Sequence, residues 1–149
     1  MAKRILVPLD LTPEAEAVLP LVVDAARGGG ATVRLLHVAP HAESVVDADG
    51  NVLAYADQEA ARLEAEASDY LSTVEAQFDG VPVEWAVRSG DPVSEILLES
   101  EAFGADLIAF TTCCPHRLTR LVLGSTADQV CRRTDAAVLV YRECRTATC

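Results

Sequence analysis

The chain has 149 residues, half of them hydrophobic, which suits a single domain over residues 1–149 with a flexible tail at residues 143–149. Charged residues interrupt every apolar run before the ~20 residues that a membrane helix needs, and acidic residues closely follow the short basic start. The formal net charge of −11 disfavours nucleic acid, so we expect a cytoplasmic protein that binds neither membranes nor nucleic acid.

Two apolar runs near the start of the chain predict buried strands. Residues 4–9 (RILVPL) are nearly all apolar and give way to Asp10, and residues 33–38 (VRLLHV) repeat this composition. His37 lies near the end of the second run. Because no nucleophile or carboxylate is indicated beside His37, we interpret it as a structural histidine and not as a catalytic base.

Between these runs the sequence predicts an amphipathic helix. Thr12 supplies a cap and Pro13 a first-turn proline, whose missing N–H costs nothing there. Apolar residues then recur at helical spacing as far as the glycines at residues 28–30. Pro20 lies within this pattern, so we expect it to kink the helix.

Residues 40–54 are predicted to form a loop, with a turn at residues 47–51 (DADGN) and a small hairpin around it. The turn resembles a calcium loop, but its glycine stands at the fourth position and no downstream glutamate completes the pattern. A long amphipathic helix follows at residues 55–78. We expect its acidic face to be solvated.

The third strand has a different pattern. Residues 81–88 alternate apolar and polar side chains and contain Pro82, which is typical of a half-exposed edge strand. Asp91 and Pro92 then mark the start of a helix that Gly104 ends.

The last part of the chain predicts a strand, a loop, a helix and a strand. The apolar strands are residues 106–111 and 136–141. The loop contains two adjacent cysteines, and the helix begins at Gly124 and Ser125, with Asp128 at capping-box spacing.

This order of elements predicts an α/β fold, an open parallel five-stranded sheet with helices on both faces. If the third strand is an edge and the first is central, the strand order is 3-2-1-4-5. The switch point then brings Asp10 beside the loop at residues 111–125, and ligands bind at such points in parallel sheets. The helix amino terminus there favours an anion, so this is the predicted site.

The charge distribution agrees with an anion at that place. Residues 1–111 carry a net charge of −14, whereas residues 112–149 contain six arginines and three acids. Arg117 and Arg120 lie in the loop itself. A second candidate is the group Cys113, Cys114 and His116, which suits a soft metal or thiol chemistry, although the cysteines can equally fill small-residue positions.

Four segments resemble the universal stress protein family: ILVPLDLTPEAEAVL, LLHV, GDPVSEILLESEAFGADLIAF and LTRLVLGSTADQVCRRTDAAVLVYR. The resemblance omits residues 40–54 and the tail after Arg142. It implies a cytoplasmic homodimer, which works through protein partners that the sequence does not identify. The dimer is expected to pair through the last strand, at Val138, Leu139, Val140 and Tyr141. Some members of the family bind ATP or AMP.

In the nucleotide-binding members, the loop carries a glycine, two residues, a second glycine, nine residues and then Gly-Ser or Gly-Thr. Here Thr111 and Cys114 occupy the two glycine positions, where a side chain obstructs the phosphates or demands an unfavourable φ. The resemblance assigns the remaining nucleotide contacts to both ends of the site. They are Asp10 and Val38 for adenine and ribose, and Gly124, Ser125 and Thr126 for phosphate, with Thr111 and Arg117 beside them.

No enzyme signature is present, and Lys3, the only lysine, cannot serve a P-loop or a receiver domain. The preferred hypothesis is a non-catalytic homodimeric stress protein with a degenerate nucleotide loop and no certain cofactor. The alternative is a stress sensor that binds ATP or AMP between the first and fourth strands. A redox-responsive or metal-responsive protein is a third hypothesis.

Overall fold

The computed structural model describes residues 2–41, 44–113 and 125–143. Its main sheet is entirely parallel and has the order β5-β2-β1-β6-β7, which confirms the predicted α/β fold and the predicted strand order. The strands of this sheet are β1 (Arg4–Pro8), β2 (Thr32–Ala39), β5 (Val83–Ser89), β6 (Leu107–Cys113) and β7 (Ala137–Glu143). The helices are η1, a 3-10 helix (Pro13–Val18), α1 (Leu19–Gly29), α2 (Ala56–Glu75), α3 (Pro92–Phe103) and α4 (Ser125–Arg133).

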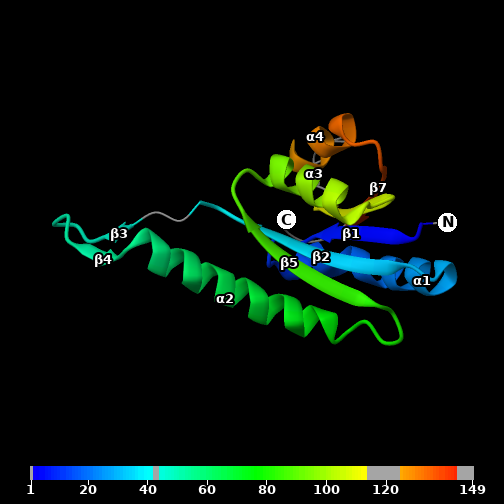
Figure 1. Cartoon of the computed structure of the whole chain (residues 1–149), viewed down its shortest axis with the longest axis horizontal. Helices are drawn as coiled ribbons and strands as arrows, with labels where there is room; N and C mark the ends of the chain where they lie inside the picture. Colours follow the sequence, from blue (N-terminus) through cyan, green and yellow to red (C-terminus); the bar gives the residue numbers. More distant parts are fainter. Residues whose placement is uncertain (1, 42–43, 114–124, 144–149) are drawn as a thin grey trace.

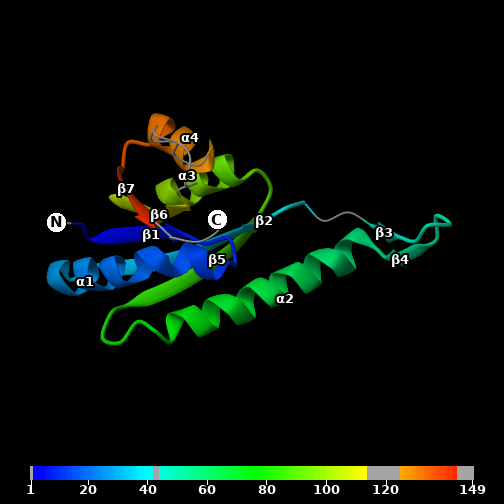
Figure 2. The ribbon, with the colours of Figure 1, turned by 180° about the vertical axis from the view of Figure 1, so that it is seen from behind.

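Helices cover both faces of the sheet (Figures 1 and 2). Successive strand residues point to opposite faces, so each buried strand contributes to two apolar cores. Leu35 of β2 belongs to the core under η1, α1 and α2, whereas Leu36 belongs to the core under α3 and α4. This explains why the first, second and fourth strands are continuous apolar runs in the sequence.

The single helix predicted after Thr12 is wrong, because two helices occupy this segment. Thr12 caps the 3-10 helix η1, with its hydroxyl accepting from the N–H of Ala15 at 3.4 Å. The α-helix α1 begins only at Leu19, so Pro20 lies in its first turn. A proline there removes no helical hydrogen bond, and the change of helix type takes the place of the expected kink.

Several strand boundaries also differ from the prediction, and two of these differences have a structural consequence. Pro82 precedes β5 because it has no N–H for the ladder, and its carbonyl accepts from the N–H of Val33 at 2.9 Å. At the other end of the sheet, β6 continues to Cys113, which pairs with Glu143 of β7. Cys113 therefore lies in a strand and not in the loop.

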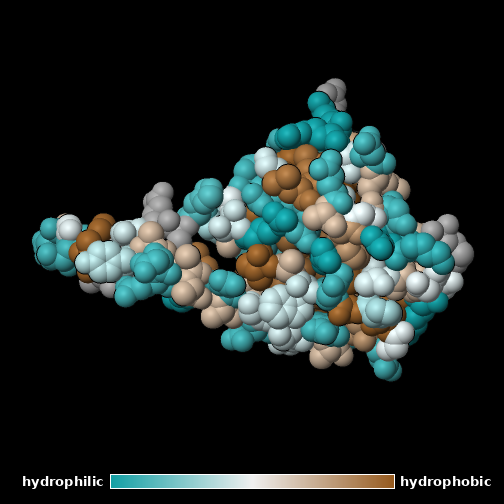
Figure 3. Space-filling view, viewed as in Figure 1, coloured by the Kyte–Doolittle hydropathy of each residue, from teal (hydrophilic) through white to brown (hydrophobic). Residues whose placement is uncertain are grey.

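The predicted hairpin is present as a separate two-stranded sheet, β3 (Val45–Val46) and β4 (Val52–Ala54). It lies at the start of α2 and projects away from the main sheet, as the space-filling view also shows (Figures 1 and 3). The predicted tail falls almost wholly outside the described residues, so the extent of the domain stays a prediction.

A buried carboxylate ties α3 to the edge of the sheet. Glu99 is only 5% exposed and accepts hydrogen bonds from Arg34 of β2, at 2.7 Å, and from Arg88 of β5. Burial raises the pKa of Glu99, but the hydrogen bonds from Arg88 and Arg34 outweigh it and hold this pKa below its ordinary value. The carboxylate is therefore ionised and paired on both oxygens.

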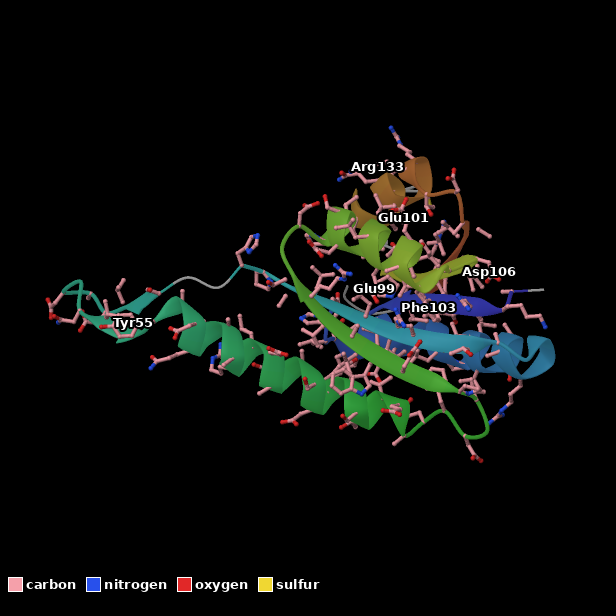
Figure 4. The ribbon with its side chains drawn as sticks, viewed as in Figure 1. Tyr55, Glu99, Glu101, Phe103, Asp106 and Arg133 are labelled. Atoms are coloured by element: carbon pink, nitrogen blue, oxygen red, sulfur yellow. The ribbon has the colours of Figure 1, made fainter. Side chains whose placement is uncertain are left out.

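The two arginines have further partners on the outside of this cluster. Arg34 donates to Glu84 at 2.8 Å, and Arg88 donates to Glu95 at 3.1 Å. The guanidinium of Arg34 also lies 4.2 Å from the ring centre of Phe103, in a cation–π contact. Figure 4 shows Glu99 and Phe103 beneath α3, at the face of the sheet.

We expect Glu99→Gln to lower the free energy of unfolding by about 3 kcal/mol, because it leaves two arginines short of a buried counter-charge. Urea denaturation at neutral pH measures this. The matched control is Glu84→Gln, which removes an exposed partner of Arg34 and should cost less than about 1 kcal/mol. The same cost for both variants would contradict the assigned role of Glu99.

The pH dependence follows from the lowered pKa. A depressed carboxyl pKa contributes stability above the unfolded value of 4.5, and this contribution is lost as the pH falls below that value. The stability difference between the wild type and Glu99→Gln should therefore shrink on acidification from pH 6 to below about pH 4.

Candidate functional site

A cavity of about 380 Å³ opens at the carboxyl ends of β1, β2 and β6. This is the switch point of the sheet, where the crossover connections from adjacent strands leave to opposite sides. Residues from the strand ends, η1, α3 and the first turn of α4 line it. They are Pro8, Leu9, Asp10, Ala15, Leu36, His37, Val38, Pro92, Ile96, Phe110, Thr111, Thr112, Thr126 and Ala127.

The cavity brings together four of the residues predicted for the site: Asp10, Val38, Thr111 and Thr126. Ser125 is the first residue of α4, next to Thr126. The remaining predicted contacts, Arg117 and Gly124, lie outside the described residues, as do Cys114, His116 and Arg120. The structure therefore describes the strand-end side of the predicted site and the start of α4.

Asp10 is exposed at the mouth of the cavity and holds the turn that follows β1. Its Oδ1 accepts from the N–H of Thr12 at 3.1 Å and from the hydroxyl of Thr12 at 2.5 Å. Within the described residues, its second oxygen, Oδ2, accepts no hydrogen bond. Asp10 thus has a fixed orientation and one carboxylate oxygen available to a ligand.

Leu11 adopts the left-handed conformation, with φ of 64°, between Asp10 and Thr12. It is the only non-glycine residue with positive φ in the described ranges. This conformation costs about 1–2 kcal/mol for a residue with a side chain, and such strain is concentrated at functional sites. It turns the chain sharply, so that Asp10 and η1 both border the cavity.

Thr111, at the first of the two glycine positions, does not need an unfavourable backbone conformation. It lies in β6 with negative φ, because the strand continues past it as far as Cys113. Its hydroxyl donates to the carbonyl of Ala15 at 2.9 Å and accepts from the N–H of Val18 at 3.0 Å. The prediction of backbone strain here is wrong, and the hydroxyl is directed to η1.

This hydroxyl bridges two backbone groups of η1, the carbonyl of Ala15 and the N–H of Val18, its last residue. Helix ends leave backbone groups without intrahelical partners, and a side chain can satisfy them. Thr12 caps η1 at its start and Thr111 satisfies two groups further along it. The wall of the cavity that contains Ala15 is therefore held from both sides.

His37 also lines the cavity, and its Nδ1 lies 2.9 Å from the carbonyl oxygen of Leu9. Since a carbonyl only accepts, Nδ1 carries a proton and donates. The ring thus links the ends of β1 and β2, which agrees with its interpretation as a structural histidine.

Sequence reasoning missed the apolar wall of the cavity. Pro92 and Ile96, one turn apart on α3, line it together with Phe110. Their spacing indicated only a core-facing helix side, because a buried core and an apolar ligand wall have the same pattern. Ala15 carried no signal beyond helical periodicity.

The cysteine group is only partly described. Cys113 ends β6, Cys131 is half-buried on α4, and Cys114 and His116 fall outside the described residues. Across the described ranges, no three His, Cys, Asp or Glu side chains form a possible metal site. None of the described helices could cross a bilayer.

Comparisons with known proteins agree with this architecture. The family model described as "Universal stress protein family" matches residues 1–142. No curated protein matches the chain. Among solved structures, hypothetical protein MJ0577 is similar with a TM-score of 0.76 at 23% identity, over 97% of this chain and 98% of that one.

Two further structures show the same fold. Universal stress protein UspA from Lactobacillus plantarum has a TM-score of 0.66 at 23% identity, over 94% of this chain and 97% of that one. A universal stress protein from Archaeoglobus fulgidus in complex with dAMP has a TM-score of 0.61 at 18% identity, over 93% and 96%. With the family match over nearly the whole length, the chain belongs to the universal stress protein family.

Proposed function

We propose that this chain is a non-catalytic, cytoplasmic universal stress protein that binds an adenine nucleotide, AMP or ATP, in the cavity at the strand ends. The observation that carries the proposal is the convergence of Asp10, Val38, Thr111 and Thr126 on one cavity of about 380 Å³. A volume in this range is typical of small-molecule sites. The similar protein from Archaeoglobus fulgidus binds dAMP, which supports an adenine nucleotide as the ligand class.

Each part of a nucleotide has a suitable part of the cavity. The free Oδ2 of Asp10 accepts hydrogen bonds and suits the ribose hydroxyls. Apolar side chains such as Ile96 and Phe110 suit the base, and the first turn of α4 at Thr126 suits phosphate, because its N–H groups have no helical partners.

The alternative is a scaffold that has lost its ligand. The replacement of both glycines of the family's loop, by Thr111 and by Cys114, favours this alternative. The arrangement of Thr111 weakens half of that argument, because its hydroxyl bonds to η1. The two functions therefore differ in one measurable property, nucleotide affinity.

We also propose that the protein forms a homodimer through β7. In the described chain β7 pairs only with β6, so its other edge is open. Residues 137–141 of this edge carry no charge, whereas the opposite edge strand, β5, carries Glu84 and Arg88. Charged side chains on an edge strand oppose pairing with another chain, and their absence from residues 137–141 permits it.

Millimolar ATP or AMP with magnesium should raise the melting temperature of the reduced protein. A ligand at a hundredfold excess over Kd adds ~2.7 kcal/mol to the stability of the folded state. Asp10→Asn keeps an oxygen for Thr12 but replaces the free acceptor by a donor, so it should weaken binding more than tenfold. Asp24→Ala, on the exposed side of α1, is the control. Equal nucleotide responses in all three proteins would exclude this site.

Variants of Thr111 distinguish a threonine that positions η1 from a threonine that obstructs the nucleotide. Thr111→Val keeps the volume but loses both hydrogen bonds, so we expect about 1–2 kcal/mol lower stability and weaker nucleotide binding, whereas Thr111→Ser should retain both. Thr111→Gly restores the family's glycine, yet it should also weaken binding because η1 loses its tie. Tighter binding by Thr111→Gly would mean that the threonine obstructs the site. Calorimetric titration gives the affinities.

The dimer is tested by Leu139→Pro and by Val140→Lys, both of which should give monomers in sedimentation experiments at low micromolar concentration. Val140→Lys keeps every backbone N–H, so it controls for damage to the ladder with β6. A wild-type monomer, or a dimer that survives both substitutions in folded protein, would contradict pairing through β7.

A further inference from the structure

A projecting arm carries half of the large exposed apolar side chains in the described chain. The arm comprises residues 44–63, which are the hairpin β3-β4 and the first two turns of α2. Val46 is 55% exposed, Val52 46% and Tyr55 62%. Val46 and Val52 are direct partners across the hairpin, so their side chains lie on one face.

The arm has a defined local structure. The carboxylate of Asp47 accepts from the N–H groups of Asp49 and Asn51, each at 2.9 Å, and from the side chain of Asn51 at 3.1 Å. At the start of α2, Gln58 accepts from the N–H of Tyr55 at 3.2 Å. A two-stranded hairpin of this length is marginal alone in water, so its apolar face needs a covering surface.

The apolar face of the arm does not pack against the main sheet of the same chain. α2 is anchored under the sheet by Ala67, Leu71 and Val74, all in its second half, and its first turns project beyond the sheet (Figures 1 and 2). The opposite face of the sheet carries α3 and α4. No described segment of the same chain covers the apolar face, which leaves it open to another molecule.

Charge excludes a second arm as this surface. Residues 44–63 contain four acidic side chains and one basic one, Arg62, which is already paired with Glu59 and Glu66. Two arms face to face would bring like charges together, which is unfavourable. A surface with apolar and positively charged groups fits better.

The chain itself has such a surface between α3 and the end of α4. A groove of about 560 Å³ lies there, and Leu98, 51% exposed, is on its wall. Arg133 also lines it and forms no ion pair within the described residues, and the neighbouring Arg132 is highly exposed. Figure 4 shows Arg133 on α4, above Glu101 of α3.

Two acids, Glu101 and Asp135, line the same groove. Arg132 is paired with Asp128, so the charge match is local to Arg133. The acids of the arm that suit it are Asp49 and Asp57, which form no ion pair within the described residues. A groove with an exposed leucine, Leu98, beside the unpaired Arg133 thus complements an arm that has exposed valines and two unpaired carboxylates.

We propose that the arm of one copy docks into the α3–α4 groove of a second copy, and that the second copy returns the same contact. Reciprocal contacts related by a two-fold axis close into a dimer and do not continue into a fibre. This interface uses neither the β7 edge nor the nucleotide cavity. It gives the protein a second way to associate.

The test uses the Val140→Lys protein, so that β7 pairing does not obscure the result. This protein should be a monomer at low micromolar concentration, and sedimentation and native mass spectrometry should show dimers when its concentration is raised to several hundred micromolar. An arm variant, Val46→Asp with Val52→Asp, and a groove variant, Leu98→Asp with Arg133→Glu, should each be monomeric. Leu21→Asp, an exposed apolar site on α1, is the matched control and should leave the dimer intact.

Mixing gives the decisive result. The arm variant retains its groove and the groove variant retains its arm, so an equimolar mixture should form heterodimers although neither variant associates alone. Thermal melting shows that each variant is folded. A Val140→Lys protein that stays monomeric at several hundred micromolar, loss of association by the arm variant only, or no heterodimer in the mixture would overturn the proposal.

Discussion

The hydroxyl of Thr111 connects the two parts of the molecule that meet at the cavity. One part is the central pair of strands, β1 and β6, and the other is η1, which follows Asp10. Hydrogen bonds of 2.9 and 3.0 Å join Thr111 to Ala15 and Val18, so the strand ends and the first helical segment are held as one unit. The shape of the cavity depends on this link, because Asp10 and Ala15 stand on either side of the strained turn at Leu11.

Much of this architecture could be read from the sequence, because parallel strands buried on both faces leave continuous apolar runs. The strand order followed from one alternating segment at residues 81–88, and the location of the site followed from that order. Pro20 was misinterpreted because periodicity does not distinguish one kinked helix from a 3-10 helix followed by an α-helix. The unfavourable φ suggested for Thr111 was wrong because a one-dimensional motif records the missing glycine but not the strand that continues past it.

Acidic residues have different roles in the body of the domain and in the arm. In the body, Glu99 is enclosed by Arg34 and Arg88, and this pairing fixes α3 on the sheet beside the cavity wall formed by Pro92 and Ile96. In the arm, the exposed acids Asp49 and Asp57 favour a positively charged partner for the apolar face. Binding and assembly would then use separate parts of one small domain, and a nucleotide at the strand ends would not compete with a second copy.

The central claim is that the cavity still binds a nucleotide although both glycines of the family's loop are replaced. Calorimetric titration of AMP into the reduced wild-type protein tests it most directly. We predict one site per chain with a Kd for AMP in the millimolar range or lower. The reason is that a cavity of about 380 Å³ with a fixed acceptor at Asp10 is already formed. No measurable binding of AMP or ATP at millimolar concentration would contradict it, and the chain would then be a ligand-free scaffold.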